Sequence, residues 1–210
     1  MRQIQRMTLK VAICAGMCLL TSTRTAWAQP IAAHHTLYNT PAPQVIHVAI
    51  RAFNNPRGNI LWVQTVGFQE YCADVLPNEW FPSWSADSLH AGALAVKMFA
   101  WYHHLHPVTI GGFTFDVDNT TNFETFRPLS GTPATDRAIQ DIWPYAYTYA
   151  DGGIAPLDYQ AGWRGSANWS LFHSQRMSQW GSSYLSDNGF NYLRILGFYY
   201  TDRVLMAMPN

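Results

Sequence analysis

The sequence predicts a single compact α+β domain in which a small mixed sheet packs against several helices. Three observations support this prediction. Removal of an N-terminal export segment leaves 182 of the 210 residues (210 − 28 = 182), which suits one domain with a sizeable core. Stretches rich in branched residues alternate along the chain with stretches of helical period. The chain also contains no repeat, heptad run or low-complexity tract.

Residues 1–28 have the pattern of a signal peptide. Three basic side chains precede the apolar residues 11–20, and Ala26-Trp27-Ala28 forms a small-x-small cleavage site. The apolar core of about ten residues is too short for a transmembrane helix, which needs about 20. We therefore expect export to the periplasm, cell wall or extracellular space, with no membrane span after cleavage. Residues 29–44 would form an extended lead before a domain over 45–210.

The charge of the mature chain argues against nucleic acid as a partner. Cleavage removes four of the 13 basic residues and no acidic ones, which leaves nine (13 − 4 = 9) against 13 acidic residues. A formal charge of −4 without a basic run does not supply the cations that phosphate binding needs. Cys72 is the one cysteine left after cleavage, so the mature chain cannot form an intrachain disulfide.

The first predicted elements are a hairpin and a short helix. Branched residues predict strands over 45–50 and 60–66, and the Asn-, Pro- and Gly-containing residues 54–59 supply the turn. Apolar residues then recur at spacings of three, one and three, which predicts a helix over 68–75. A loop pinned by two prolines follows at Pro77–Trp84.

The second helix is predicted over 86–102, with Ser85 as its N-cap. Gly92 in its middle costs about 1 kcal/mol relative to Ala, so we expect another group to approach closely there. The helix ends in three histidines within four residues, 103–106. Adjacent and i,i+2 side chains do not face one another on a helix, which favours a solvated helix end over a metal site.

The same patterns predict the rest of the chain. The expected elements are strands over 111–115 and 123–127, a helix over 134–149 with a break at Pro144, a helix opened by His173 and stopped at Gly189, a helix over 192–200 and an edge strand over 203–206.

Glu79 is the first candidate for chemistry because it is the one acidic side chain in the apolar and aromatic loop after Pro77. Loss of hydration there would penalise the charged form and raise the pKa toward the range of a general acid. The alternative is a surface glutamate stabilised by a helix dipole. The second candidate is His173, which is followed by Ser174, Ser178 and Gln179; a structural hydrogen-bonding role is its alternative. No G-x-S-x-G elbow, H-E-x-x-H, P-loop or dinucleotide fingerprint occurs.

Four stretches resemble the SpoIID/LytB family, which comprises the sporulation stage II protein D and the amidase enhancer LytB. Residues 70–84 are similar to its E-Y-x-x-G-V-L-P-x-E-x-P-x-S-W stretch, and residues 88–100 match A-L-K-A-Q-A-V-A-A-R-T-Y-A in outline. Residues 173–182 are similar to H-G-x-G-M-S-Q-x-G-A, and residues 189–202 to the family's tail. The resemblance covers about residues 60–205.

The resemblance implies a peptidoglycan lytic transglycosylase with Glu79 as general acid on the bond between N-acetylmuramic acid and N-acetylglucosamine. The 6-hydroxyl of the muramic acid attacks its own anomeric carbon, so one carboxyl suffices where ordinary glycosidases use two. Substrate would be oriented by residues at the positions of the family's polar residues: His173, Ser178, Gln179, Lys97, His90 and Glu124.

The implied partners are peptidoglycan glycan strands and a cell-wall amidase, and no cofactor is implied. Some family members hold zinc through Cys and His, and no Cys is available in that region here, so we predict no metal. The family's Lys, Gln and Arg appear as His90, Gly92 and Lys97. Two alternatives therefore stay open: a non-catalytic amidase-enhancing or wall-binding module, and an unrelated exported hydrolase with a site at His173.

Overall fold

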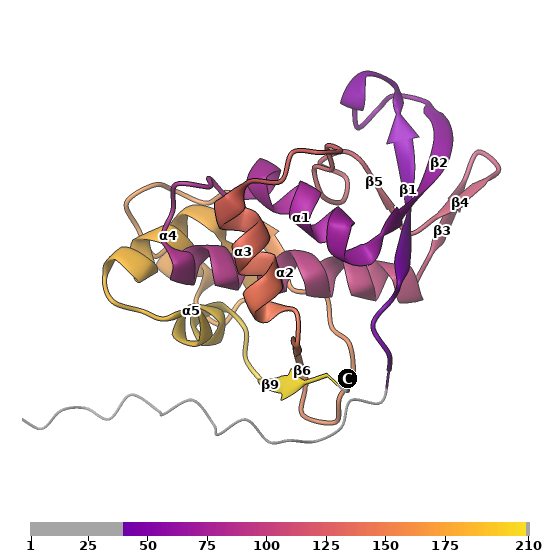
Figure 1. The fold of residues 1–210 in the computed structure, drawn as a ribbon. Helices are drawn as coiled ribbons and strands as arrows, with labels where there is room; N and C mark the ends of the chain where they lie inside the picture. The colour runs from indigo at the N-terminus through magenta and orange to yellow at the C-terminus, as the bar shows by residue number, and fades with distance from the viewer. Residues whose placement is uncertain (1–39, 209–210) are drawn as a thin grey trace, which may run out of the picture.

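The computed structural model describes residues 40–208. The predicted signal peptide (1–28) and most of the predicted lead (29–44) lie outside the described residues. Over 40–208, five α-helices and four small sheets form the α+β arrangement that the sequence predicts (Figure 1). None of the helices in this part of the chain combines the length and hydropathy that a membrane crossing requires.

The N-terminal sheet has the strand order β2-β1-β5. Strands β1 (Val45–Arg51) and β2 (Ile60–Gly67) pair antiparallel around the 3-10 turn η1 (Ala52–Asn54), which confirms the predicted hairpin. The short strand β5 (Val117–Asp118) joins the other side of β1 in parallel. Beside this sheet, β3 (Val108–Ile110) and β4 (Phe113–Phe115) form a second small hairpin (Figure 1).

Helix α1 (Phe68–Glu79) is longer than the helix predicted over 68–75. It continues through Pro77 and ends on Glu79, so the prediction of a loop from Pro77 was wrong at its start. Pro77 has no N–H to donate to the carbonyl of Ala73, yet the helix continues past it. In the same turn the side chain of Asn78 donates to the carbonyl of Asp74 at 2.7 Å. The acid therefore occupies the last position of a helix.

Helix α2 (Ala86–Leu105) begins as predicted, because the Ser85 hydroxyl accepts a hydrogen bond from the backbone N–H of Ser88. The expected close approach at Gly92 is confirmed. A Cβ at this position would lie 2.6 Å from two ring carbons of Trp80. The glycine thus provides the space into which the Trp80 indole packs.

The predicted break at Pro144 is confirmed, but the prediction that 145–149 are helical was wrong. Helix α3 (Pro133–Ile142) ends before Pro144, and the alternating aromatic residues that follow form strand β6 (Tyr145–Tyr149). This strand pairs antiparallel with β9 (Arg203–Ala207), the edge strand that the sequence predicts. Aromatic residues favour a pleated surface once proline has interrupted the helix.

The C-terminal part contains the parallel pair β7 (Asp158–Gln160) and β8 (Arg176–Ser178), the 3-10 turn η2 (Trp169–Leu171), and helices α4 (Gln179–Asp187) and α5 (Tyr192–Tyr199). The helix predicted to open at His173 begins instead at Gln179, since Ser178 caps it. The predicted stop at Gly189, which has a φ of 81°, and the predicted final helix are confirmed.

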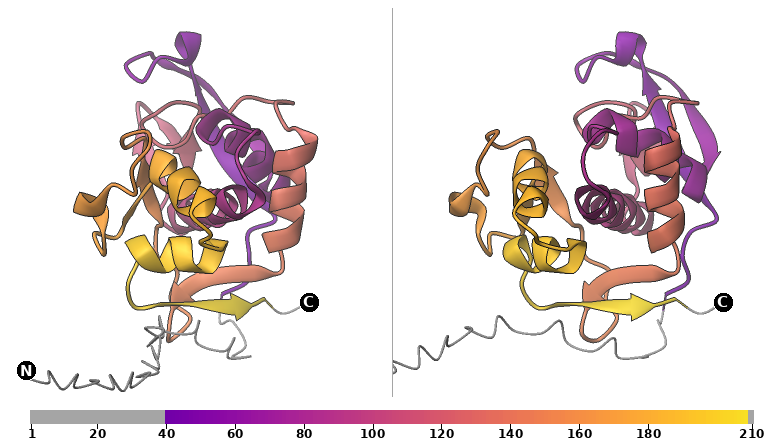
Figure 2. Two further views of the ribbon diagram at one scale, coloured as in Figure 1. Left: turned by 90° about the vertical axis from the view of Figure 1, so that its left-hand side faces the viewer. Right: turned by 60° about the vertical axis from the view of Figure 1, so that its left-hand side comes forward.

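Helix α2 lies at the centre of the described chain. It packs against α1, α3, α4 and α5, and Figure 2 shows it enclosed between α1 and α3 on one side and the α4–α5 pair on the other. One hydrophobic core cluster extends from Ile46 to Met206. Elements distant in sequence are therefore held against a common helix, which brings the ends of α1 and α4 together.

Candidate active site around Glu79

Trp80 fixes the position of the last residue of α1. Its side chain is 1% exposed, its indole N–H donates to the Ser182 hydroxyl at 3.0 Å, and its ring meets that of Tyr159 edge-on at 4.9 Å. The same ring fills the space left by Gly92. Because its neighbour Trp80 is held on α2 and α4, Glu79 lies at a defined place between these elements.

Two hydrogen bonds hold the Glu79 side chain, and both come from distant parts of the sequence. Its Oε1 accepts from the backbone N–H of Thr125 at 2.8 Å, and its Oε2 accepts from Nε2 of Gln179 at 2.9 Å. Nε2 of Gln179 also lies 2.8 Å from the Glu79 carbonyl oxygen, to which it donates. The strand predicted over 123–127 is absent, and the N–H of Thr125 in this segment serves the carboxylate instead.

Gln179 is positioned by the cap of α4. The hydroxyl of Ser178 accepts from the backbone N–H of Gly181 at 2.8 Å and donates to the Ala161 carbonyl at 3.3 Å. Ser178 is fully buried. We expected Ser178 to contact substrate. In the structure its side chain is instead the N-cap of α4, where it fixes the start of the helix.

A second carboxyl, that of Glu124, lies close enough to Glu79 to be affected by its charge. Glu124 is fully buried, and its oxygens accept from the hydroxyls of Tyr71 at 3.1 Å and Tyr159 at 3.0 Å. Burial first, and then the negative charge of Glu79, raise the pKa of Glu124 well above its usual range. Its uncharged form is favoured, and its burial is incompatible with the predicted direct contact with substrate.

Lys97 and His90 belong to a different part of the molecule. The buried Lys97 ammonium donates to the carbonyls of Trp143 at 2.7 Å and Tyr145 at 2.8 Å, and burial lowers the pKa of Lys97 to about 7. His90 Nε2 lies 3.3 Å from a carboxylate oxygen of Asp141. Both side chains tie α2 to α3 and the chain after it, and among residues 40–208 neither of them bonds to the Glu79 carboxylate.

His173 is also separate from the acid. Among residues 40–208, the hydrogen bonds to the Glu79 carboxylate come from Thr125 and Gln179. His173 is exposed, and its ring stacks on that of Phe172 with 3.7 Å between the ring centroids. Its backbone N–H donates to the carbonyl oxygen of Phe198 at 3.0 Å. Of the six side chains expected beside Glu79, the structure thus brings Gln179 into contact with it.

Phe81, Trp84 and Trp180 form an aromatic cluster close in sequence to Glu79 and Gln179. The three rings lie 4.9 to 5.4 Å apart, and the Arg164 guanidinium lies 5.3 Å above the Trp180 ring. These residues line a surface pocket of about 530 Å³. Phe81 follows Glu79 by two residues and Trp180 follows Gln179 directly, but neither Glu79 nor Gln179 itself lines the pocket.

Sequence reasoning missed three contributors: the Thr125 N–H, the tyrosine pair around Glu124, and Arg164. A backbone donor leaves no signal in side-chain chemistry. The tyrosines and the arginine lack a local pattern that would reveal their partners. Trp180 carried a usable signal, because it lies beside Gln179 in a stretch already singled out.

Comparison with known proteins adds little about activity. No family model matches the chain. An uncharacterized protein of Brachyspira hyodysenteriae is 36% identical over 88 residues, which are 40% of this chain and 23% of that protein. The matched part is thus less than a quarter of that relative's length, and the relative's description gives no activity.

Proposed function

We propose that this protein is an exported, peptidoglycan-acting protein of SpoIID/LytB type that cleaves glycan strands between N-acetylmuramic acid and N-acetylglucosamine. One observation carries the proposal: the 2.9 Å hydrogen bond between Glu79 Oε2 and Gln179 Nε2. These residues are 100 positions apart, and they belong to the two stretches that resemble the family most closely. Their contact is what a shared site would require.

The proposed chemistry needs one carboxyl. Protonated Glu79 donates its proton to the glycosidic oxygen as the bond from that oxygen to the muramic acid C1 breaks. The 6-hydroxyl oxygen of the same muramic acid forms a new bond to C1, and its proton passes to the Glu79 carboxylate. The products are a 1,6-anhydro end and a free 4-hydroxyl, and no water is consumed.

The surroundings of Glu79 are compatible with this role. A carboxylate offers about four acceptor positions, so the bonds from Thr125 and Gln179 leave positions for a sugar hydroxyl, and the protonated form can donate its O–H to the glycosidic oxygen. Holding the acid in one orientation favours proton transfer to a bound substrate. The pocket with the aromatic cluster and Arg164 supplies apolar faces for sugar rings and a cation for a muramic carboxylate.

The test compares Glu79→Gln with a matched control, Glu70→Gln, in which an exposed glutamate of the same helix is changed. Each protein is incubated with purified glycan strands, and the ends are identified by mass spectrometry. The wild type and Glu70→Gln should release 1,6-anhydro ends, while Glu79→Gln should be at least about 100-fold slower, as expected for loss of a general acid. Equal rates for all three proteins would refute the role of Glu79.

A second candidate function is a non-catalytic module that binds wall glycan or enhances a cell-wall amidase. The observation that favours it is that protein donors occupy both oxygens of Glu79. This candidate predicts that the protein sediments with wall sacculi and raises the rate of an added amidase. It also predicts that no anhydro ends appear and that Glu79→Gln leaves both properties unchanged.

A further inference from the structure

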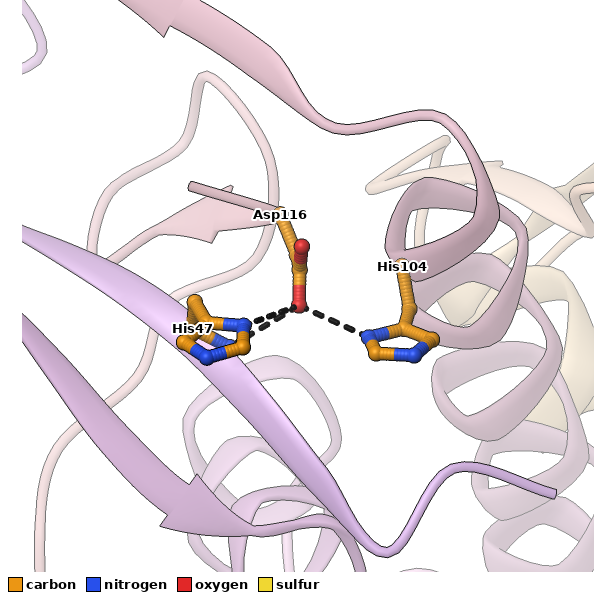
Figure 3. Close-up of side chains that lie close together, drawn as sticks. All are labelled: His47, His104 and Asp116. Carbon is orange, nitrogen blue, oxygen red and sulfur yellow. Dashed lines mark hydrogen bonds and ion pairs between the residues drawn. The ribbon is translucent and has the colours of Figure 1, made fainter. Parts of the chain in front are cut away.

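Two histidines and an aspartate from separate elements meet at one point (Figure 3). His47 lies on β1, His104 in the last turn of α2, and Asp116 between β4 and β5. Oδ2 of Asp116 is 2.9 Å from Nδ1 of His104 and 3.2 Å from Nδ1 of His47. The potential ligand atoms all lie within 4.8 Å of one another.

The carboxylate is the fixed member of this group. The Asp116 side chain is 5% exposed, and Oδ2 also accepts from the backbone N–H of His47 at 2.9 Å. The N–H of Asp116 in turn donates to the His47 carbonyl at 2.9 Å. The side chains of His47 and His104 are 44% and 30% exposed, so an ion could reach the group from solvent.

The spacing suits a small tetrahedral ion. With bonds of about 2.0 to 2.1 Å, two ligands of a tetrahedral zinc ion lie about 3.3 Å apart. Two of the three spacings, 2.9 and 3.2 Å, are already near this value, and the third is within 4.8 Å. Two imidazoles and a carboxylate form a ligand set that zinc accepts, with the fourth position left for water.

We propose that His47, His104 and Asp116 bind one divalent transition-metal ion, with zinc as the preferred ion. The histidine run at the end of α2 was expected to be a solvated helix end because its members do not face one another. The partners of His104, however, lie outside its own helix, on β1 and in the segment after β4. The prediction of no metal considered neither of those segments.

The ion would act on structure and not on the proposed chemistry at Glu79. It would join three segments whose ligands are 57 and 12 positions apart along the chain (104 − 47 = 57; 116 − 104 = 12). Gly92, against which Trp80 packs, precedes His104 by twelve helical residues, or about 18 Å. The metal proposal therefore stands or falls independently of the proposed function.

The experiment titrates untagged, metal-free protein with Zn²⁺ alone by calorimetry, and with Co²⁺ to record its visible absorption. The wild type should bind one Zn²⁺ per chain, and Co²⁺ should give the strong visible bands of tetrahedral coordination. His104→Ala should weaken binding by at least tenfold, because loss of a ligand exceeds the usual effect of an outer-shell change. The control is His106→Ala, whose exposed ring contacts the Tyr102 carbonyl, and it should bind like the wild type.

Circular dichroism establishes that each variant is folded, and His47→Gln, at the more exposed ligand, serves as the second test if His104→Ala does not fold. The proposal is overturned if the wild type shows no stoichiometric binding. It is also overturned if the ligand variants bind as the wild type does, or if His106→Ala loses affinity equally. In those cases Asp116 is solely a hydrogen-bond acceptor for two histidines.

Discussion

Replacement of Gly92 by alanine tests how the acid is positioned. In a helix interior this change normally stabilises by about 1 kcal/mol, since glycine is the poorer helix former. Here the new Cβ would lie 2.6 Å from two carbons of the Trp80 ring, whereas carbon atoms normally approach to about 3.5 to 4.0 Å. The ring cannot withdraw freely, because it is buried and bonded to Ser182.

The expected magnitude follows from these opposing effects. Overpacking costs about 1 to 3 kcal/mol. A middle value of about 2 kcal/mol, less about 1 kcal/mol of helix propensity, leaves Gly92→Ala less stable by about 1 kcal/mol. Gly197→Ala in α5 is the matched control, because a Cβ there meets nothing within 4 Å. That variant should be more stable by up to about 1 kcal/mol.

Urea unfolding of the two variants and the wild type measures both effects. Opposite signs for Gly92→Ala and Gly197→Ala support the packing of Trp80 on α2. If Gly92→Ala is as stabilising as Gly197→Ala, the close contact at Gly92 is not present in solution. The placement of Glu79 derived from Trp80 would then be refuted. Where the contact is real, the displaced Trp80 should also lower glycan cleavage.

Two further predictions concern Gln179 and Lys97. Gln179→Ala removes the hydrogen bonds that Gln179 Nε2 donates to the carbonyl and to Oε2 of Glu79, and it should slow release of anhydro ends by about tenfold or more. The exposed Gln69→Ala should not slow it, and equal rates for the two variants would show that Gln179 does not position the acid. Burial lowers the pKa of Lys97 to about 7 from the unfolded value of 10.5. Between pH 7 and 8.5 the Lys97 amine is therefore protonated in the unfolded chain and mostly neutral in the folded one. Because the unfolded state binds more protons, the free energy of unfolding rises with pH. The slope should approach about 1.4 kcal/mol per pH unit and be absent in Lys97→Met, as measured by urea unfolding; parallel pH profiles would contradict the buried, deprotonating lysine.

Local sequence patterns predicted the elements whose secondary structure does not depend on tertiary contacts. The β1–β2 hairpin follows from branched residues around a turn, and α2 follows from its cap at Ser85 and its apolar stripe. Errors arose where tertiary contacts decided the outcome. Tyr145–Tyr149 forms a strand because it pairs with β9. Residues 123–127 do not form the predicted strand, and the backbone N–H of Thr125 donates to the Glu79 carboxylate instead.

The residues of the candidate site could be predicted where they belong to short sequence motifs. Glu79 stood out by its apolar neighbours, and Gln179 by its place in a recognisable stretch. Lys97 was expected to orient substrate because it stands where the family has an arginine, whereas the fold buries its ammonium against two carbonyls. The histidine run containing His104 was visible in the sequence, but its association with His47 and Asp116 was not, since each of the three residues comes from a different element.

The most direct test of the central claim is glycan cleavage in water enriched in oxygen-18. If Glu79 transfers the proton while the muramic 6-hydroxyl attacks C1, the new ends contain no heavy oxygen and are lighter by one water than hydrolysed ends. Glu79→Gln should yield almost none of them. New ends that carry oxygen-18 would show hydrolysis and contradict the single-carboxyl mechanism, and a complete lack of new ends with the wild type would contradict cleavage itself.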